Sequence, residues 1–196
     1  MASFTELLQT HGFGLPSGPL GRIGGALMAR GNAETERSLV KLAAIADTET
    51  VLVLGPGPGI GLEAAGERAR RAIGVEPSEL MREQCEKRCL AQIACGRVRV
   101  LPGDAEHTGQ PDASVDVLLS VNNVMLWPDR EAGLAEAFRV LRPGGRLLIS
   151  AHQRWLPDGL AEAVRATGFA DVQSWTWQPP NTRMATLAAQ LRAVRP

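Results

Sequence analysis

The sequence predicts an α/β fold in which a mainly parallel sheet follows a helical N-terminal segment. Helical patterns fill about the first fifty residues. From Val51 onward, short apolar runs alternate with helical patterns. This alternation indicates βαβ units with right-handed crossovers, and therefore a parallel sheet.

The segment before the first strand predicts three helices. The first covers residues 3–10, where Ser3-Phe-Thr-Glu6 has the form of a capping box. The second covers residues 20–30. Asn32 is a suitable N-cap for the third helix. Its apolar residues recur at helical spacing: Leu39, Leu42, Ala43 and Ala46.

We expect a single domain over residues 1–196, with a helical lead-in at 1–48 and an α/β core at 49–196. The predicted strands of the core are 51–54, 71–75, 98–101, 115–121, 145–150 and 170–176. The predicted helices are 60–69, 78–94, 129–140 and 157–167. The tail 183–194 fits a helix by local propensity, but a last antiparallel strand would complete the sheet, and we predict the strand. Residues 11–31, dense in glycine and proline, are our hypothesis for a lid over the site.

Composition excludes several classes of protein. Lysine plus arginine and aspartate plus glutamate both number 21, so nothing favours nucleic acid or an anionic membrane as a partner. The chain has no tyrosine, which excludes a tyrosine base. No apolar run is long enough to cross a bilayer, and no signal-peptide pattern is visible. The three cysteines do not suggest a disulfide framework, so we predict a cytoplasmic protein.

A glycine-rich turn follows the first predicted strand, with glycines at Gly55, Gly57 and Gly59. Glycine permits positive φ and lets a ligand approach the backbone closely. Dehydrogenases, flavoproteins and methyltransferases share such a turn. Pro56 and Pro58 remove two N–H donors, which suits a single carboxylate better than a pyrophosphate.

Polar residues follow the next strands. Glu76 ends the second strand, where a carboxylate can accept hydrogen bonds from both hydroxyls of a ribose; the alternative is a solvent-facing side chain. Asp104, between Gly103 and Ala105, can accept from an adenine amino group or simply form a turn. Ser120 and Asn122 lie at the mouth of the apolar fourth strand, which indicates a binding site rather than core.

Five segments occur in the order and spacing of class I S-adenosylmethionine-dependent methyltransferases, and the chain resembles this family over about residues 30 to 175. The segments are Gly55–Gly59, Val75–Ser78, Gly103–Ala105, Ser120–Pro128 and Leu141–Gly145. The chain is most similar to the ubiquinone/menaquinone-biosynthesis branch (methyltransferase type 11). The resemblance implies a Rossmann-like, doubly wound sheet of seven strands in the order 3-2-1-4-5-7-6, with the last strand antiparallel.

The resemblance also implies transfer of a methyl group from S-adenosylmethionine to O, C or N of a small-molecule acceptor, which leaves S-adenosylhomocysteine. The cofactor-binding residues that it implies are Gly55, Pro56, Gly57, Gly59, Glu76, Pro77, Met81, Gly103, Asp104, Ala105, Ser120 and Asn122. Of these, the turn would cradle the methionine part. The residues after the second and third strands would hold the ribose and adenine. Backbone carbonyls of the fourth strand would approach the methionine amino group.

One position departs from the family. Two residues before its first glycine the family usually has Asp or Glu, which helps to hold the ammonium group of the cofactor. The residue here is Val53. Either the backbone carbonyls of residues 120–122 suffice, or the affinity for the cofactor is reduced.

On the acceptor side, His152 lies just past the fifth predicted strand. It is the best candidate for a general base where the acceptor must lose a proton; the alternative is a residue on a surface loop. Met125 and Trp127 could wall a substrate pocket or equally pack against the following helix.

Cys85 and Cys89 lie four residues apart on one helix face, with Cys95 nearby. We interpret them as small buried residues rather than as a thiol site for a metal or arsenic, and we predict no metal.

Two other functions stay open. An NAD(P)-dependent oxidoreductase would share the glycine turn and Glu76 but would usually need more chain. A non-catalytic protein that binds S-adenosylmethionine is suggested by Val53. Nucleic-acid substrates are disfavoured because residues 121–124 lack the Asn/Asp-Pro-Pro-aromatic segment that holds a flipped base. We expect no stable membrane association, and a monomer or homodimer.

Overall fold

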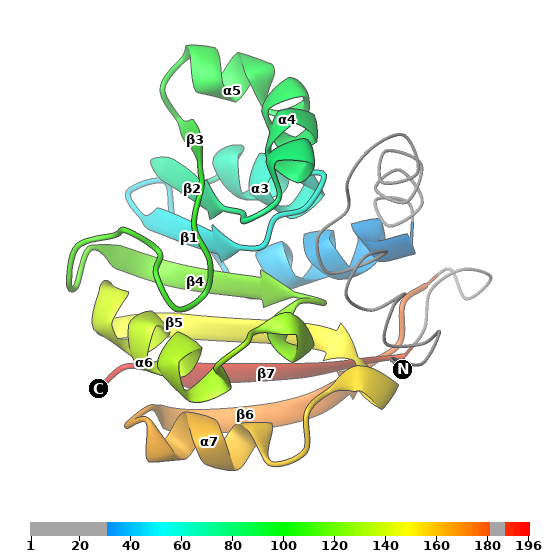
Figure 1. The fold of residues 1–196 in the computed structure, drawn as a ribbon, viewed down its shortest axis with the longest axis vertical. Helices are drawn as coiled ribbons and strands as arrows, with labels where there is room; N and C mark the ends of the chain where they lie inside the picture. Colours follow the sequence, from blue (N-terminus) through cyan, green and yellow to red (C-terminus); the bar gives the residue numbers. More distant parts are fainter. Residues whose placement is uncertain (1–30, 181–186) are drawn as a thin grey trace, which may run out of the picture.

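The computed structural model describes residues 31–180 and 187–196, which form a sheet covered by helices on both faces (Figure 1). The two helices predicted before residue 31 lie outside these residues, as does nearly all of the proposed lid. The sheet has seven strands in the order β3-β2-β1-β4-β5-β7-β6. Neighbouring strands among β1 to β5 are parallel, and β7 runs antiparallel between β5 and β6. This is the strand order that the resemblance implied.

The strands are β1 (Thr50–Leu54), β2 (Arg71–Val75), β3 (Val98–Leu101), β4 (Val115–Val121), β5 (Leu141–His152), β6 (Ala170–Trp177) and β7 (Ala188–Val194). The helices are α3 (Ile60–Gly66), α4 (Glu79–Arg88), α5 (Leu90–Ala94), α6 (Arg130–Val140) and α7 (Leu160–Ala166), with short 3-10 turns η2 (Val124–Leu126) and η3 (Gln153–Trp155). Residues 31–42 are also helical and form the unlabelled blue helix of Figure 1.

Three sequence-based boundaries need correction. The helix predicted over 78–94 is two helices, because the backbone leaves helical geometry at Cys89 (φ −89°, ψ 13°). The fifth strand begins at Leu141 rather than 145, because Leu141 pairs with Val115 ahead of a register shift. Asn32 lies within a helix and not at its N-cap. In contrast, the strand predicted in the tail is confirmed over Ala188–Val194.

Two hydrophobic clusters cover the two faces of the sheet. One packs α6 and α7 against the sheet, and in Figure 1 these helices lie on the side facing the reader. The other packs α3, α4 and the helix over residues 31–42 against the opposite face. The sheet is therefore doubly wound, and its apolar strands are buried on both faces as expected for parallel sheets.

The helix over residues 31–42 is docked firmly on the second face. Leu39, Val40 and Ala43 are buried, whereas Leu42, predicted to share the apolar stripe, is 41% exposed. Ala46 lies beyond the helix and is exposed. At the end of this helix, the Arg146 guanidinium donates to the Ala43 carbonyl at 2.7 Å. The side chains of this helix thus have fixed places above the sheet.

The carboxyl ends of β1, β2 and β4 meet at one edge of the sheet. Leu54 at the end of β1 pairs with Val75 of β2 and with Ser120 of β4. The backbone ladder continues past the strands, since Gly55 N donates to Val75 O at 2.9 Å. The glycine-rich turn, Glu76 and the residues after β4 therefore lie at one crevice. Within the described ranges, no helix is both long and apolar enough to cross a membrane.

Candidate functional site

The glycine-rich turn between β1 and α3 needs glycine for two different reasons. Gly55, Gly57 and Gly59 all have positive φ (55°, 52° and 91°), which side-chain-bearing residues rarely adopt. At Gly59 a Cβ would also lie 2.7 Å from Cys85 Sγ and 3.1 Å from Cys85 Cα. At Gly57 a Cβ would meet nothing within 4 Å in residues 31–180 and 187–196, so within this part of the chain the Gly57 backbone borders open space. The turn thus packs on α4 at one end and is open to a ligand in the middle.

Glu76 joins the turn to the end of β2. The residue is only 5% exposed, and each carboxylate oxygen accepts one backbone hydrogen bond: Oε2 from Gly57 N at 3.0 Å and Oε1 from Ser78 N at 3.0 Å. Burial raises the pKa of this carboxyl, although both hydrogen bonds act to lower it. A carboxylate oxygen can accept more than one hydrogen bond. The group is therefore held in place and can still accept from ligand hydroxyls.

The first turn of α4 holds the backbone at Glu76 and Pro77 in place. Ser78 is the N-cap, and its hydroxyl accepts from Met81 N at 3.4 Å. The Arg82 guanidinium donates to the carbonyls of Glu76 (2.9 Å) and Pro77 (2.8 Å). Of the two residues predicted to flank adenine, Pro77 is exposed and Met81 is buried.

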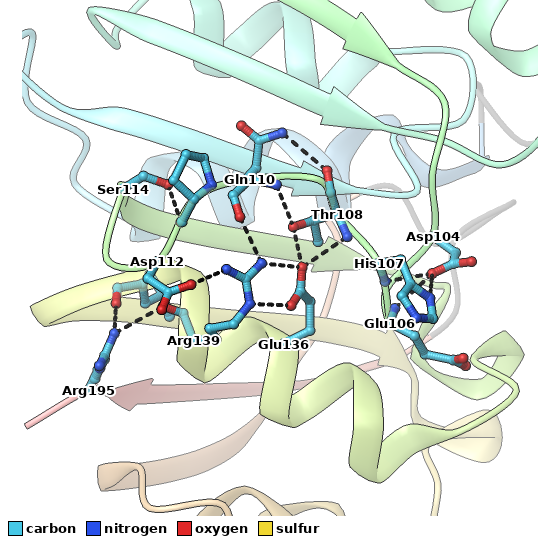
Figure 2. Close-up of polar contacts among 12 residues, drawn as sticks. Asp104, Glu106, His107, Thr108, Gln110, Asp112, Ser114, Glu136, Arg139 and Arg195 are labelled. Atoms are coloured by element: carbon cyan, nitrogen blue, oxygen red, sulfur yellow. Dashed lines mark hydrogen bonds and ion pairs between the residues drawn. The ribbon is translucent and has the colours of Figure 1, made fainter.

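The loop between β3 and β4 is held by α6 (Figure 2). Asp104 Oδ1 accepts from Glu106 N at 3.0 Å and from His107 N at 2.7 Å. Asp104 therefore stabilises a turn, which is one of the two roles expected for it. Further along, Glu136 of α6 accepts from the Thr108 hydroxyl at 2.6 Å and from its backbone N–H. These contacts fix the Gly103-to-Ala105 segment beside the carboxyl end of β2.

Asn123 is the residue of this crevice that the sequence reasoning missed. Its amide nitrogen donates to the Leu54 carbonyl at 2.7 Å and to the Val121 carbonyl at 3.2 Å. Its oxygen accepts from the Ser120 hydroxyl at 2.6 Å and the Trp127 ring nitrogen at 3.0 Å. Asn123 thus ties the ends of β1 and β4 together. The only sequence signal is an Asn-Asn pair directly after an apolar strand.

Asn122 makes the corresponding link to β5. It has a positive φ of 53°, its N–H donates to Ser150 O at 2.7 Å, and its side-chain oxygen accepts from His152 N at 2.9 Å. Its Nδ2 is buried and has no hydrogen-bond partner in the described part of the chain. Ser120 and Asn122 thus lie at the crevice as predicted, and their side chains also brace it.

His152 lies at the end of β5, next to Trp155, with ring centroids 4.8 Å apart in an edge-to-face contact. Burial and, to a lesser degree, the charge of Arg154 hold its pKa below the usual value. The imidazole is therefore neutral at neutral pH and chemically able to accept a proton.

Trp127 and Met125 pack inside the fold, as in the alternative to a role as walls of a substrate pocket. The Trp127 ring covers Gly133 of α6, where a Cβ would lie 2.6 Å from the ring. Met125 packs against the cluster beneath α6 and α7.

Cys85 and Cys89 fit the interpretation as small buried residues, whereas for Cys95 that interpretation is wrong, because its side chain is exposed beyond the end of α5. Cys85 and Cys89 are buried and Cys95 is exposed, and all three are free thiols. A hydrogen bond with Cys89 and burial both raise the pKa of Cys85, which keeps that thiol protonated and unreactive. Among the described residues, no group of three or more His, Cys, Asp and Glu could hold a metal ion.

A seven-stranded sheet of this order, with a glycine turn after β1 and a buried carboxylate after β2, defines a Rossmann-like nucleotide-binding protein of the S-adenosylmethionine-dependent class. Comparisons with known proteins agree with this class. The methyltransferase-domain family matches residues 52–149, half of the 196-residue chain. The chain belongs to this family, and S-adenosylmethionine is its cofactor.

Known relatives differ in length and role. The uncharacterized methyltransferase YdaC of Bacillus subtilis is 28% identical over 134 residues, covering 67% of this chain and 72% of that protein. The ubiquinone/menaquinone biosynthesis C-methyltransferase UbiE of Dinoroseobacter shibae is 33% identical over 118 residues, covering 59% of this chain and 44% of that protein. The chain spans less than half of the length of several other relatives.

A solved structure shares the fold. Phosphoethanolamine N-methyltransferase 2 of Haemonchus contortus, in complex with phosphomonomethylethanolamine and S-adenosylhomocysteine, superposes with a TM-score of 0.76 at 16% identity. The superposition covers 100% of this chain and 61% of that one.

Proposed function

We propose that the chain transfers a methyl group from S-adenosylmethionine to a small-molecule acceptor. The bound cofactor supplies the methyl group on a sulfonium, which an acceptor displaces in line. The residues then have to hold the cofactor, align the acceptor and exclude water.

The observation that carries this proposal is the 3.0 Å hydrogen bond between Glu76 Oε2 and Gly57 N. It places the carboxylate proposed for the ribose directly against the turn proposed for the methionine part. Because Gly57 borders open space and the Glu76 oxygens retain acceptor capacity, the residues present fit an adenosine joined to an amino acid.

The remaining cofactor contacts follow from the crevice. Pro77 is exposed beside Glu76 and can flank the adenine, and the Asp104 to Ala105 segment can contact its edge. Met81 is buried and would support the adenine-binding segment rather than touch the ring from open solvent. The carbonyls near Ser120 and Asn122 remain our candidates for the methionine amino end.

On the acceptor side we assign His152 as the candidate base, because its lowered pKa keeps it neutral. A small acceptor is supported by the balanced charge of the chain and by the structural neighbour whose complex contains phosphomonomethylethanolamine. Acceptors with an acidic hydroxyl or carbon would need such a base, whereas a neutral amine would not.

The test is isothermal titration of the protein with S-adenosylmethionine, S-adenosylhomocysteine and NAD in parallel. We expect the two adenosyl compounds to bind and NAD not to bind. Binding of NAD alone would overturn the proposed site. A screen of small acceptors for S-adenosylhomocysteine release then tests transfer itself, and binding without turnover on any acceptor would favour the non-catalytic alternative.

A further inference from the structure

A buried carboxylate from outside the family-matched region reaches the turn between β1 and α3. Glu36 lies on the helix over residues 31–42, and the residue is only 9% exposed. Its Oε2 accepts from Gly61 N at 2.5 Å, two residues after the last glycine of the turn. A Cβ at Gly61 would lie 3.0 Å from the same oxygen. A side chain at position 61 would therefore require the Glu36 carboxylate to move by a few tenths of an ångström.

The electrostatic surroundings of Glu36 are unusual for a group that only holds two helices together. Burial raises its pKa to about 7, with the Gly61 hydrogen bond and the more distant charges of Arg88 and Arg37 opposing the rise. Among the described residues, Glu36 forms no ion pair within 4.0 Å, although Arg37 pairs with Glu34 and Arg88 with Glu63. A buried carboxylate without a cation is costly. A cationic ligand group would remove that cost.

The helix that carries Glu36 packs on the same face of the sheet as Val53. The Val53 side chain points onto the face of the sheet that α3 and the helix over residues 31–42 cover, in the same hydrophobic cluster as Leu39 and Val40. A carboxylate at position 53 would be attached to the sheet beneath this turn. Glu36 brings a carboxylate to the same turn from the helix above.

The cofactor's methionine part carries one carboxylate and one ammonium group. Backbone N–H groups of the glycine turn can serve the carboxylate. They cannot serve the ammonium, which is only a donor and needs an acceptor, best a charged one. Glu36 is the buried carboxylate bonded to the first turn of α3, whereas Glu76 is bonded to Gly57 on the β2 side.

We propose that Glu36 binds the ammonium group of S-adenosylmethionine, in place of an acidic residue at position 53. This inference rests on the function proposed above. It gives the lead-in helix a direct part in cofactor recognition. The ammonium donates to the carboxylate oxygen of Glu36 that does not accept from Gly61.

The experiment compares two ligands that differ in the amino-acid part. S-adenosylhomocysteine carries the ammonium, and 5′-methylthioadenosine lacks the whole amino-acid part. Both are titrated calorimetrically into the wild-type protein, Glu36→Gln and the control Glu34→Gln. Glu34 is an exposed residue of the same helix. Glutamine at position 36 keeps an acceptor for Gly61 N and removes only the charge.

We expect Glu36→Gln to weaken S-adenosylhomocysteine binding roughly 10- to 100-fold, the size of a lost charge-assisted hydrogen bond. Methylthioadenosine binding should stay unchanged in both variants, which also reports an intact fold. Equal weakening of both ligands would mean that Glu36 only positions the turn, and no weakening of either would exclude any role. Both results would overturn the inference. Failure of the wild-type protein to bind either ligand would instead count against the proposed function.

If Glu36→Gln does not fold, the pH dependence of the wild-type protein decides. The charged and titratable groups facing Glu36 are Arg37 on its own helix, Arg88 and Cys85 on α4, and Glu63 on α3 through Arg88. Protonation of Glu36 below its raised pKa should weaken S-adenosylhomocysteine binding from pH 8 to pH 6 and leave methylthioadenosine binding flat. Parallel pH profiles for the two ligands would overturn the inference, because they would place the titrating group at the shared adenosine.

Discussion

The two ends of the crevice satisfy their polar groups differently. At the β1–β2 end, both oxygens of Glu76 accept backbone hydrogen bonds. At the β4–β5–β7 end, three buried polar atoms have no hydrogen-bond partner among the residues that the structure describes: Asn122 Nδ2, Ser150 Oγ and Gln190 Nε2. Ser150 and Gln190 face each other in register on β5 and β7.

This difference separates a preorganised region from an incomplete one. A hydrogen-bonded carboxylate holds its geometry before any ligand arrives, so the β1–β2 end can bind a constant cofactor at little ordering cost. A buried polar atom without a partner costs stability. Ser150 and Gln190 are almost fully buried, so these two side chains carry such a cost inside the fold.

The largest expected effect comes from breaking the preorganised turn. Gly59→Ala combines a φ of 91° with a Cβ 2.7 Å from Cys85 Sγ, and should cost about 2–4 kcal/mol of unfolding free energy from backbone strain plus overpacking. We also expect S-adenosylhomocysteine binding to fall, because Cys85 and α4 must shift. Urea unfolding and calorimetry measure the two effects.

The matched control is Gly96→Ala, at a glycine with φ 77° and open space around its Cβ. It should cost only about 1–2 kcal/mol from the left-handed backbone and leave ligand binding unchanged. Equal losses at the two glycines would mean that contact with α4 does not matter at Gly59.

The next effect concerns the charge of Glu76. Glu76→Gln should weaken S-adenosylhomocysteine and methylthioadenosine alike, by roughly 10- to 100-fold, because both contain the ribose that this carboxylate accepts from. The exposed Glu79→Gln on α4 serves as the control. A loss confined to S-adenosylhomocysteine would place Glu76 at the amino-acid part and would contradict the roles given to Glu76 and Glu36.

The smallest effect tests the incomplete end. Ser150 is fully buried, and its hydroxyl has no partner within the described ranges, so Ser150→Ala should raise the free energy of unfolding by about 1 kcal/mol. Cofactor binding should not change. The control is Ser114→Ala, which removes a hydroxyl that donates to Pro111 O at 2.7 Å. This variant should lower the free energy of unfolding by about 1 kcal/mol. Destabilisation by Ser150→Ala would show that its hydroxyl is satisfied and would remove the contrast between the ends.

Sequence reasoning predicted the placement of those residues whose position depends on neighbours along the chain. The turn from Gly55 to Gly59, Glu76 after β2 and the residues after β4 all lie at the expected edge of the sheet. Their spacing is local, and parallel strands bring their carboxyl ends together. Local patterns failed at Cys89, where one predicted helix becomes two, and at Asn32, predicted as an N-cap but helical.

The sequence by itself determined the succession of strands and helices along the chain, the glycine turn and the family, because each depends on residues that are close together in the sequence. Only the tertiary structure decided that Glu36 reaches Gly61 and that Asn123 joins β1 to β4. These contacts link residues 25 and 69 positions apart. No local periodicity specifies them, since they exist only once helices and strands have packed on the same face or edge of the sheet.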